Sequence, residues 1–363
     1  MSSLPRDSLT KRERVELALD RQPTDRVPLY DVLVHDRAIQ HLTGEWPPFG
    51  EEGLRLRLQA TARILDMTRM VGVAPQPPGD TTDAEGFVHY RQDPWIGGGI
   101  RQRPFADEAG ARRWLEGKIR ALQRPLDIDR FRRDYLAQLD KARAYLGDDT
   151  VIVQEYGPGL DWVRYSLGLE LFSYLSVDAP QLITDYIRAY TDRELERIRA
   201  TADARRSPCA LPYGDIAYKG RLIHDPQWLR REFFPPLAEI NRALHDCGVR
   251  CLFHSDGFLM EALPDLLAAG IDGLNPIETC AGMDLRQVKE EYGDRLFLTG
   301  GIDISQLMAL APADEVRRVC REAMAAASPG YFIGSTTELD NGSRLENILT
   351  MVETAWGRPL SPA

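Results

Sequence analysis

The stretch Val249-Arg250-Cys251-Leu252-Phe253-His254-Ser255-Asp256-Gly257 contains the pattern on which the fold depends. Its first five residues form a short, mainly apolar run, which is typical of a buried β-strand. Polar residues and a glycine follow at once. The same order recurs along the second half of the chain. The other apolar runs are Val151-Ile152-Val153, Cys209-Ala210-Leu211, Gly270-Ile271-Asp272-Gly273-Leu274, Leu296-Phe297-Leu298 and Tyr331-Phe332-Ile333.

These runs predict a parallel β-sheet whose strands alternate with helices. Each run is short, and helical patterns separate most of them, as in repeated β-α units. The segment 26–34 and one further strand before residue 106 bring the expected number of strands to about eight, the number in a β/α barrel. We therefore predict an α/β fold, a single (β/α)8 TIM-type barrel with an N-terminal helical elaboration, ahead of a doubly wound open sheet.

The domain organisation follows from this prediction. A length of 363 residues suggests two or three domains by itself, but one barrel can use the whole length. We expect residues 1–363 to form one domain, with residues 1–25 as a helical extension. In this extension Ser8 or Thr10 caps the start of a helix, and Pro23 ends it. Residues 51–72 and 107–147 are also helical in pattern. The glycine-rich segment between Phe87 and Phe105 is typical of a hairpin or a loop over a site.

The composition excludes several classes of protein. A net charge of -10 argues against nucleic acid as a main partner, because phosphate binding needs clustered Lys and Arg. We expect neither a membrane span nor a signal peptide. Five cysteines in so long a chain do not indicate a disulfide framework, so we expect a cytoplasmic protein. The spacing of Cys247 and Cys251 is compatible with a zinc site. A cysteine in an apolar strand such as residues 249–253 is, however, more often a small core residue.

The polar residues after each apolar run are the candidates for function. In a parallel barrel the carboxyl ends of the strands converge on one mouth, where active sites lie. The residues expected there are Glu155, Tyr156, Asp215, His254, Asp256, Asn275, Glu278, Thr337 and Glu338. Helix capping accounts for part of the pattern, notably for Ser255, Thr299 and Asp303. It accounts less well for His254, Glu155 and Glu278.

His254 and Asp256 are the most specific functional signal in this pattern. Residues two apart at the end of a strand point to the same side. The pair is therefore suited to bind a metal, or to act as a base with its orienting carboxylate. The alternative is a structural pair in which His254 bonds to a neighbouring loop.

The chain resembles the uroporphyrinogen decarboxylase superfamily over nearly its whole length. The resemblance depends on the order and spacing of several segments. They are Lys11-Arg12-Glu13-Arg14-Val15, Pro23-Thr24-Asp25-Arg26-Val27-Pro28, Asp215-Ile216-Ala217-Tyr218-Lys219-Gly220, His254-Ser255-Asp256-Gly257, Leu263-Pro264-Asp265-Leu266, Gly270-Ile271-Asp272-Gly273-Leu274-Asn275-Pro276, Gly300-Gly301-Ile302-Asp303 and Leu345-Glu346-Asn347-Ile348. The superfamily includes decarboxylases and cobalamin-dependent methyltransferases, and its fold is a single β/α barrel.

Departures from the decarboxylase pattern argue against tetrapyrrole decarboxylation. The two arginines that bind propionates in those enzymes fall on Leu33 and Arg37 here, so one of them is missing. A histidine late in the family sequence falls on Thr337. The family's catalytic aspartate is not identified in residues 75–95, where the candidates are Asp80, Asp83 and Asp93.

The methyltransferase branch keeps zinc on a His-x-Cys segment and on a second, late cysteine. In this chain the first cysteine is replaced by Asp256, and the second falls near Thr337 with Glu338 beside it. By this resemblance His254, Asp256 and Glu338 are the expected metal ligands. Carboxylates are acceptable zinc ligands in catalytic sites, so zinc is the metal expected, in the role of a Lewis acid on a methoxyl oxygen.

Three functions compete. The first is a methyltransferase or O-demethylase acting on a small substrate, with a corrinoid protein as partner. His254, Asp256, Asp215 and Glu155 are the expected catalytic residues, and Asp215, Glu155 and Glu278 would line the mouth. Aromatic walls could come from Tyr156, Trp162, Tyr165 and Trp95, although such residues more often pack in the core.

The second is a metal-free decarboxylase or lyase acting on a small carboxylate. Arg37 would anchor the carboxylate, and His254 would carry the proton. Tyr156, Asn275, Glu278 and Thr337 complete the expected substrate-binding set. The third is a non-catalytic, ligand-binding barrel, because a fold does not imply a function. A homodimer is the default oligomeric state.

Overall fold

Six parallel strands form the largest sheet of the computed structural model, which describes residues 7–96 and 98–360. In spatial order they are β14 (Tyr331–Ser335), β13 (Phe297–Ile302), β12 (Gly273–Ile277), β11 (Arg250–His254), β8 (Cys209–Pro212) and β7 (Gln154–Tyr156). Each predicted apolar run thus contributes to a strand. All residues of β12, β13 and β14 are buried, as expected for parallel strands covered on both faces.

Short pairings extend this sheet at both edges. β2 (Met67–Thr68) pairs in parallel with β6 (Val151–Ile152), which precedes β7 directly. Isolated parallel bridges join Leu29 to Ile333 of β14 and Tyr30 to Met67 of β2. The pairings therefore lead from β14 through residues 29–30 and β2 to β6. β1 (Leu33–Val34) pairs in parallel with β15 (Leu339–Asp340).

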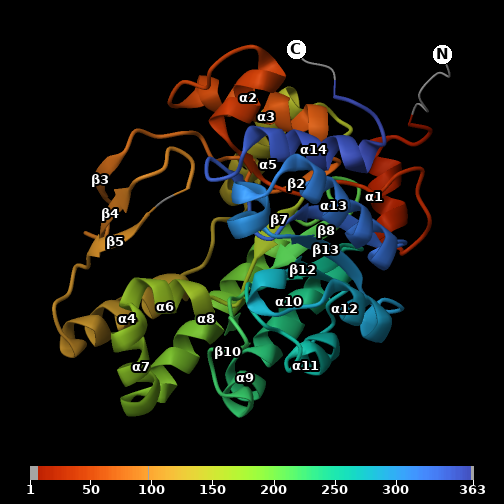
Figure 1. Cartoon of the computed structure of the whole chain (residues 1–363). Coiled ribbons are helices and arrows are strands. Elements are labelled where there is room, and N and C mark those ends of the chain that lie inside the picture. The colour runs from red at the N-terminus through yellow and green to blue at the C-terminus, as the bar shows by residue number, and fades with distance from the viewer. Residues whose placement is uncertain (1–6, 97, 361–363) are drawn as a thin grey trace, which may run out of the picture.

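Helices surround the parallel strands (Figure 1). Those before β8 are α1 (Lys11–Leu19), α2 (Asp36–Thr43), α3 (Glu51–Ile64), α4 (Glu108–Leu122), α5 (Ile128–Leu146), α6 (Leu160–Leu167), α7 (Leu169–Asp178) and α8 (Pro180–Thr201). Those after it are α9 (Pro226–Glu232), α10 (Phe234–Asp246), α11 (Leu263–Ala268), α12 (Leu285–Tyr292), α13 (Ala313–Ala327) and α14 (Leu345–Trp356), with the short turns η1 (Thr279–Ala281) and η2 (Ile304–Met308). Within residues 7–96 and 98–360, no helix is both long and apolar enough to cross a membrane.

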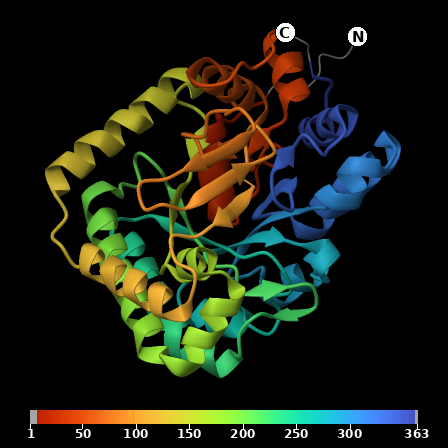
Figure 2. The ribbon, with the colours of Figure 1, turned by 90° about the vertical axis from the view of Figure 1, so that its left-hand side faces the viewer.

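A small antiparallel sheet lies apart from the parallel strands. It consists of β3 (Gly79–Thr82), β4 (Val88–Arg91) and β5 (Gly99–Gln102). Figure 2 shows this sheet in front of the parallel strands, which confirms the predicted hairpin between Phe87 and Phe105. A second antiparallel pair, β9 (Ala217–Tyr218) with β10 (Arg221–Leu222), follows β8.

Two expected elements are shorter than predicted. The predicted helix over residues 51–72 ends at Ile64, because Leu65 is extended and the chain then enters β2. The strand predicted over residues 26–34 is reduced to two isolated bridges and β1. Two-residue strands carry too few apolar residues to stand out from a helical pattern.

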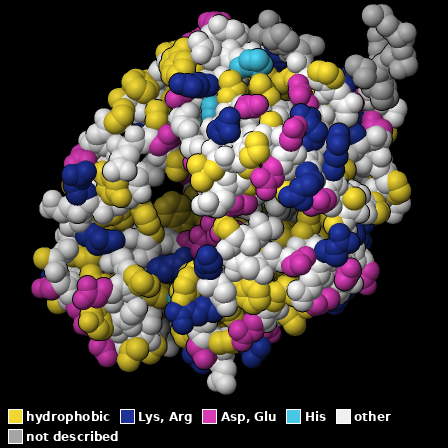
Figure 3. Space-filling view, viewed as in Figure 1, with side chains coloured by type: hydrophobic (Ala, Val, Ile, Leu, Met, Phe, Trp, Pro, Cys, Tyr) yellow, Lys and Arg dark blue, Asp and Glu magenta, His cyan; other side chains and the backbone are white. Residues whose placement is uncertain are grey.

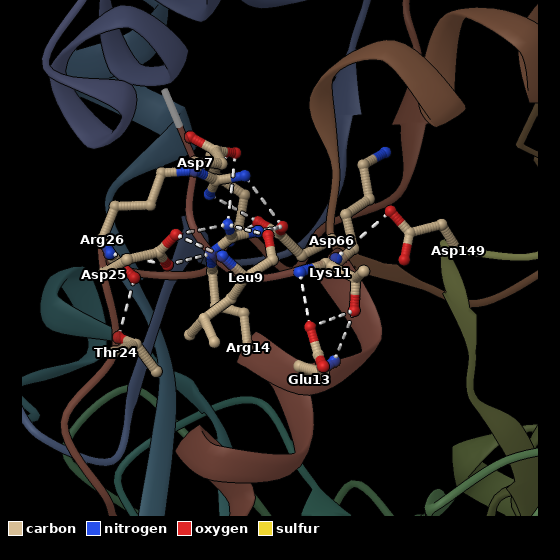
Figure 4. Close-up of polar contacts among 12 residues, drawn as sticks. Asp7, Leu9, Lys11, Glu13, Arg14, Thr24, Asp25, Arg26, Asp66 and Asp149 are labelled. Atoms are coloured by element: carbon tan, nitrogen blue, oxygen red, sulfur yellow. Dashed lines mark hydrogen bonds and ion pairs between the residues drawn. The ribbon is translucent and has the colours of Figure 1, made fainter. Parts of the chain in front are cut away.

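A buried ion-pair network fixes α1 to the start of the parallel strands (Figure 4). Thr10 caps α1 in a capping box with Glu13. The fully buried Arg14 donates to Asp25 and Asp66, each at 2.7 Å. Asp66 also accepts from Arg26 and from the backbone N–H of Leu29. The segments 11–15 and 23–28 that resemble the family are thus structural in this protein.

Candidate functional site

The carboxyl end of β11 supplies two side chains of the site. β11 ends at His254, and Asp256 follows two residues later. Gly257 has a φ of +99°, and a Cβ there would lie 2.4 Å from the backbone of Ala217 and Tyr218. Only glycine allows this close approach to β9. Glu278 accepts a hydrogen bond from the N–H of Gly257 at 2.5 Å. The turn that carries Asp256 is therefore fixed both by its contact with β9 and by its hydrogen bond to Glu278.

Asp215, His254 and Asp256 converge at this point. Each offers one oxygen or nitrogen, and these three atoms lie within 4.8 Å of one another. Nε2 of His254 is 4.0 Å from Oδ1 of Asp215, which also accepts the backbone N–H of Asp256 at 3.1 Å. All three residues are half-buried. One nitrogen and two carboxylates at this spacing form a candidate cation site.

The hydrogen bonds of Asn275 set the orientation of His254. Nδ2 of Asn275 donates to Oγ1 of Thr299 at 2.6 Å, and the Thr299 hydroxyl donates to the Leu274 carbonyl at 3.4 Å. Oδ1 of Asn275 therefore faces Nδ1 of His254, at 2.7 Å. This network assigns the proton to Nδ1 and leaves the lone pair of Nε2 toward Asp215.

Asp256 is the most perturbed group of the three. Its Oδ1 is buried and has no hydrogen-bond partner among the described residues. Burial, with the nearby carboxylates of Asp215, Glu278 and Glu338, raises the pKa of Asp256 to about 6, although His254 acts in the opposite direction. A buried carboxylate oxygen without a partner is costly, and a bound cation would remove that cost.

Asp161 and Arg164 of α6 position Asp215. The backbone N–H of Asp215 donates to both carboxylate oxygens of Asp161, at 3.1 and 3.0 Å. Arg164 donates to the Asp215 carbonyl and to Asp161, each at 2.6 Å. Burial raises the pKa of Asp161, and the charge of Asp215 adds to this effect. The pair was not expected from the sequence, because nothing in its local pattern distinguishes it from an ordinary i,i+3 pair on a helix.

Arg69, directly after β2, binds two of the three predicted glutamates. It donates to Glu155 at 3.0 Å and to Glu338 at 2.9 Å, and only 9% of its side chain is exposed. Glu338 is therefore committed to Arg69, while Asp215 lies beside His254 and Asp256. The group beside this cavity that could hold a cation is Asp215, His254 and Asp256, whereas the set expected by resemblance has Glu338 in place of Asp215.

These side chains line a cavity of about 690 Å³. Its lining residues are Arg69, Met70, Gly72, Val73, Glu155, Asp161, Trp162, Arg164, Tyr165, Leu211, Tyr213, Asp215, His254, Asp256 and Glu338. Figure 3 shows the molecule hollowed between the small antiparallel sheet and the parallel strands. All four residues predicted to be catalytic, His254, Asp256, Asp215 and Glu155, are thus brought together.

The residues predicted to bind substrate are more scattered. Arg37 is exposed and lines a separate hollow near Trp46. Tyr156 lines a neighbouring cavity. Asn275 and Glu278 bond to His254 and Gly257 and do not line the cavity, and neither does Thr337. A direct substrate contact of these five residues in the His254 cavity has no support in the geometry.

Other expectations are corrected by local contacts. Asp303 caps η2 as predicted. Ser255 and Thr299 are not caps: the Ser255 hydroxyl accepts from the N–H of Ile216, and Thr299 lies within β13. Trp95 is buried and donates to Asp36, so it packs in the core.

The remaining candidates lie away from this cavity. Asp80, Asp83 and Asp93 belong to the small antiparallel sheet and its loops, and none of the three lines the His254 cavity. Cys251 is buried and lies near His245 and Asp272, in a group that does not include Cys247.

Comparison with known proteins finds a family match over part of the chain. Residues 215–357 match the family model of uroporphyrinogen decarboxylase, a range that contains Asp215, His254 and Asp256. A methyltransferase from Methanosarcina mazei has a similar fold, with a TM-score of 0.68 at 18% identity over 96% of this chain and 98% of that one. Residues 215–357 are thus similar to the uroporphyrinogen decarboxylase family, and the fold is similar to that of the methyltransferase.

Other solved structures that match this chain are more remote. A glycerophosphoryl diester phosphodiesterase from Parabacteroides distasonis has a TM-score of 0.38 at 11% identity, over 98% of this chain and 96% of that one. No curated protein sequence matches this chain. The comparisons therefore show a likeness to one family over residues 215–357 and a likeness in fold, and the reaction has to be argued from the site.

Proposed function

We propose that this protein is an enzyme that transfers a methyl group between a small substrate and the corrinoid of a partner protein. In this proposal Asp215, His254 and Asp256 hold a divalent metal, with zinc as the expected ion. The observation that carries the proposal is the buried Oδ1 of Asp256, which has no hydrogen-bond partner in the described part of the chain. It lies beside His254 and Asp215 in a cavity large enough for a small molecule.

We further propose that the parallel strands close into an eight-stranded barrel. The pairings through residues 29–30 support closure, because they connect β14 to β2 and so to β6 and β7. In such a barrel the ends of β8 and β11 face the same mouth. That placement accounts for the meeting of Asp215 with His254, although the two residues are distant in the sequence.

The donor set fits a borderline or hard divalent ion. One imidazole nitrogen and two carboxylates are acceptable zinc ligands, and three protein ligands leave a position open for substrate. When bound, the ion would supply Lewis-acid polarisation of a methoxyl oxygen. Asn275 keeps the Nε2 lone pair of His254 available, and Asp161 holds the backbone that carries Asp215.

The atoms and electrons of the methyl transfer balance without an added oxidant. The bond between the substrate's oxygen and its methyl carbon would break, and the methyl group would pass to the reduced corrinoid of the partner protein, which is the second substrate of the reaction. The oxygen keeps the bonding electron pair and takes a proton from water. Arg69 pairs with both Glu155 and Glu338 in the cavity wall, and its positive charge weakens the repulsion between these two carboxylates and the electron-rich oxygen.

The geometry does not favour the decarboxylase alternative. Such an enzyme needs an arginine that is free to bind the substrate's carboxylate. Both arginines that line the cavity, Arg69 and Arg164, already pair with carboxylates, and Arg37 lies elsewhere. The convergence of ligand-type side chains likewise gives no support to a non-catalytic barrel.

Metal content and methyl transfer together test the proposed function. Protein purified without chelator is expected to contain about one equivalent of metal, as a single three-ligand site requires. Reduced cobalamin should then be methylated from methoxylated donors, as followed by its absorption spectrum. Less than about 0.1 equivalent of zinc, cobalt, iron or manganese, with no uptake on titration, would contradict a single three-ligand site.

The role of Asn275 provides a second test. Asn275→Leu removes the bond to Nδ1 of His254 at similar volume, and we expect zinc affinity to fall about 10–100-fold, as for other residues that orient a ligand. A competition titration measures the change. Asn241→Leu is the matched control, because Asn241 is equally buried and donates to the Ala269 carbonyl, away from the site. Equal effects of the two variants would show that His254 needs no orienting partner.

A further inference from the structure

A histidine, a cysteine and an aspartate come together at the end of β11 that lies opposite to His254. Cys251 is the second residue of β11, and Asp272 directly precedes β12. His245 lies in the last turn of α10. One donor atom from each of the three lies within 4.8 Å of the other two. At about 3.3 Å per residue along a strand, Cys251 is roughly 10 Å from His254, so this group is separate from the His254 cavity.

Backbone hydrogen bonds fix two members of this group against each other. Asp272 donates its N–H to the Cys251 carbonyl at 2.8 Å, and its Oδ2 accepts the N–H of Cys251 at 2.7 Å. The carbonyl of Asp272 accepts the N–H of Phe297, at the start of β13, at 3.0 Å. Three neighbouring parallel strands therefore hold the thiol and the carboxylate in place, as a preorganised pair of ligands requires.

The side-chain atoms of the group make only weak commitments to other partners. Sγ of Cys251 faces the carbonyl of Asn241 at 3.7 Å, and a thiol is a weak donor. Oδ1 of Asp272 accepts no hydrogen bond within the described part of the chain. Nε2 of His245 donates to Oδ2 of Asp272 at 2.7 Å, but the two side chains are 38% and 24% exposed, and exposed pairs contribute little to stability. An ion would therefore displace little.

The charges around His245 favour a cation. The hydrogen bond to Asp272 raises the pKa of His245, burial opposes this rise, and the charges of Asp272 and Asp246 add to it, whereas Arg250 lowers it. Arg250 is itself paired with Asp20 at 2.5 Å. The exposed parts of His245 and Asp272 give an ion access from solvent on the side of α10.

We propose that His245, Cys251 and Asp272 form a second metal site, which takes a divalent ion that accepts sulfur, with zinc as the expected ion. Imidazole nitrogen, thiolate sulfur and carboxylate oxygen are the donors that zinc uses in proteins. A tetrahedral zinc ion spaces such ligand atoms about 3.3–3.6 Å apart, so Nε2 and Oδ2 must separate, which the exposed side chain of His245 allows. Starting from the imidazolium that Asp272 favours, binding releases two protons to water, one from the thiol and one from Nε2. No electron is transferred.

A structural role fits the position of this second site. In β/α folds the active site lies at the other end of the strands, and an ion here would tie α10 to β11 and β12. Because its entry displaces a hydrogen bond and two protons, we expect this site to fill after the one at His254. Protein purified without chelator would then still contain about one equivalent of metal, and a second equivalent would enter on titration. The proposal keeps Cys251 as a ligand but replaces Cys247 by His245 and Asp272.

Titration of the chelator-treated protein with cobalt(II) tests the proposal, because a thiolate ligand gives bound cobalt a sulfur-to-metal charge-transfer band in the near ultraviolet. The group of Asp215, His254 and Asp256 contains no sulfur, so this band reports the second site alone. We expect it to appear with the second equivalent and to persist in Asp256→Ala. The absence of the band in the wild-type protein, with cobalt in large excess, would overturn the proposal. A band without methyl transfer would count against the proposed function and leave this site standing.

Three cysteine variants and one histidine variant identify the ligands. Cys251→Ser should abolish the band, whereas Cys247→Ser and Cys320→Ser should leave it unchanged; Cys320 is the control for the loss of a fully buried thiol. His245→Gln alters a partly exposed side chain and should fold normally. It should weaken cobalt binding at this site by about 100-fold or more, beyond the 10–100-fold effect of residues that only orient a ligand. Loss of the band in Cys247→Ser, or unchanged affinity in His245→Gln, would contradict the proposed ligand set.

Discussion

Replacement of Arg14 by methionine is expected to lower the free energy of unfolding by about 3–5 kcal/mol, the usual cost of removing one partner from a buried ion pair. Methionine keeps most of the apolar stem of the side chain. It leaves Asp66, which is fully buried, with one charged partner in place of two. Asp25 loses its bond to the Arg14 Nε at 2.7 Å. Urea denaturation followed by circular dichroism measures the change.

Two further variants sharpen this test. Arg318→Met removes an exposed i,i+4 pair with Glu322 on α13 and should cost no more than about 0.5 kcal/mol. Arg14→Lys keeps the charge but cannot contact Asp25 and Asp66 with a planar fork, so we expect it to rescue only part of the loss. A cost below about 1 kcal/mol for Arg14→Met, the level of an exposed pair, would show that the network in Figure 4 is not a main anchor of α1.

Asp256→Ala is expected to lower zinc affinity by at least about 100-fold, because residues that merely orient ligands already account for 10–100-fold. The substitution removes one of three potential ligands and the partnerless buried oxygen with it. The absorption spectrum of bound cobalt(II), used as a zinc substitute, provides an independent measurement of the same loss. The folded state should be retained or stabilised, since an uncompensated buried carboxylate is removed.

Asp303→Ala is the matched control for this variant. Asp303 also follows a strand, but its carboxylate caps η2, so its loss should cost about 1 kcal/mol of stability and leave metal affinity unchanged. Asp215→Ala and Glu338→Ala decide between the two ligand sets. Loss of metal in Glu338→Ala, with none in Asp215→Ala, would restore the set predicted from sequence.

The strands of the fold could be predicted because apolar runs bounded by glycine or proline mark buried parallel strands. Every such run contributes to a strand, and the Thr10 cap also appears as expected. Leu29 and Tyr30 lie within the strand predicted over residues 26–34, but β2 was not expected, because its pairing depends on distant residues such as Val151. The closed barrel stays a prediction.

The site was predictable in part, for a similar reason. His254, Asp256, Asp215 and Glu155 follow apolar runs, and the end of a parallel strand is a position that sequence can recognise. Arg69 and Asp161 follow no such run. Their importance comes from contacts 86 and 54 residues away, with Glu155 and with Asp215, which no local pattern encodes.

The pairing of residues 29–34 with residues 333–340 has a consequence for synthesis on the ribosome. At about 5–20 residues per second, the first of these segments waits roughly 15–60 s for its partner to emerge. During that time the Arg14–Asp66 network can form, because its members lie within the first 66 residues. The nascent amino-terminal segment can thus fold early through this network, while the backbone of residues 29–34 still lacks its partner strand. An unpaired strand edge can pair with the strands of other chains. Chaperone demand should therefore peak late in translation.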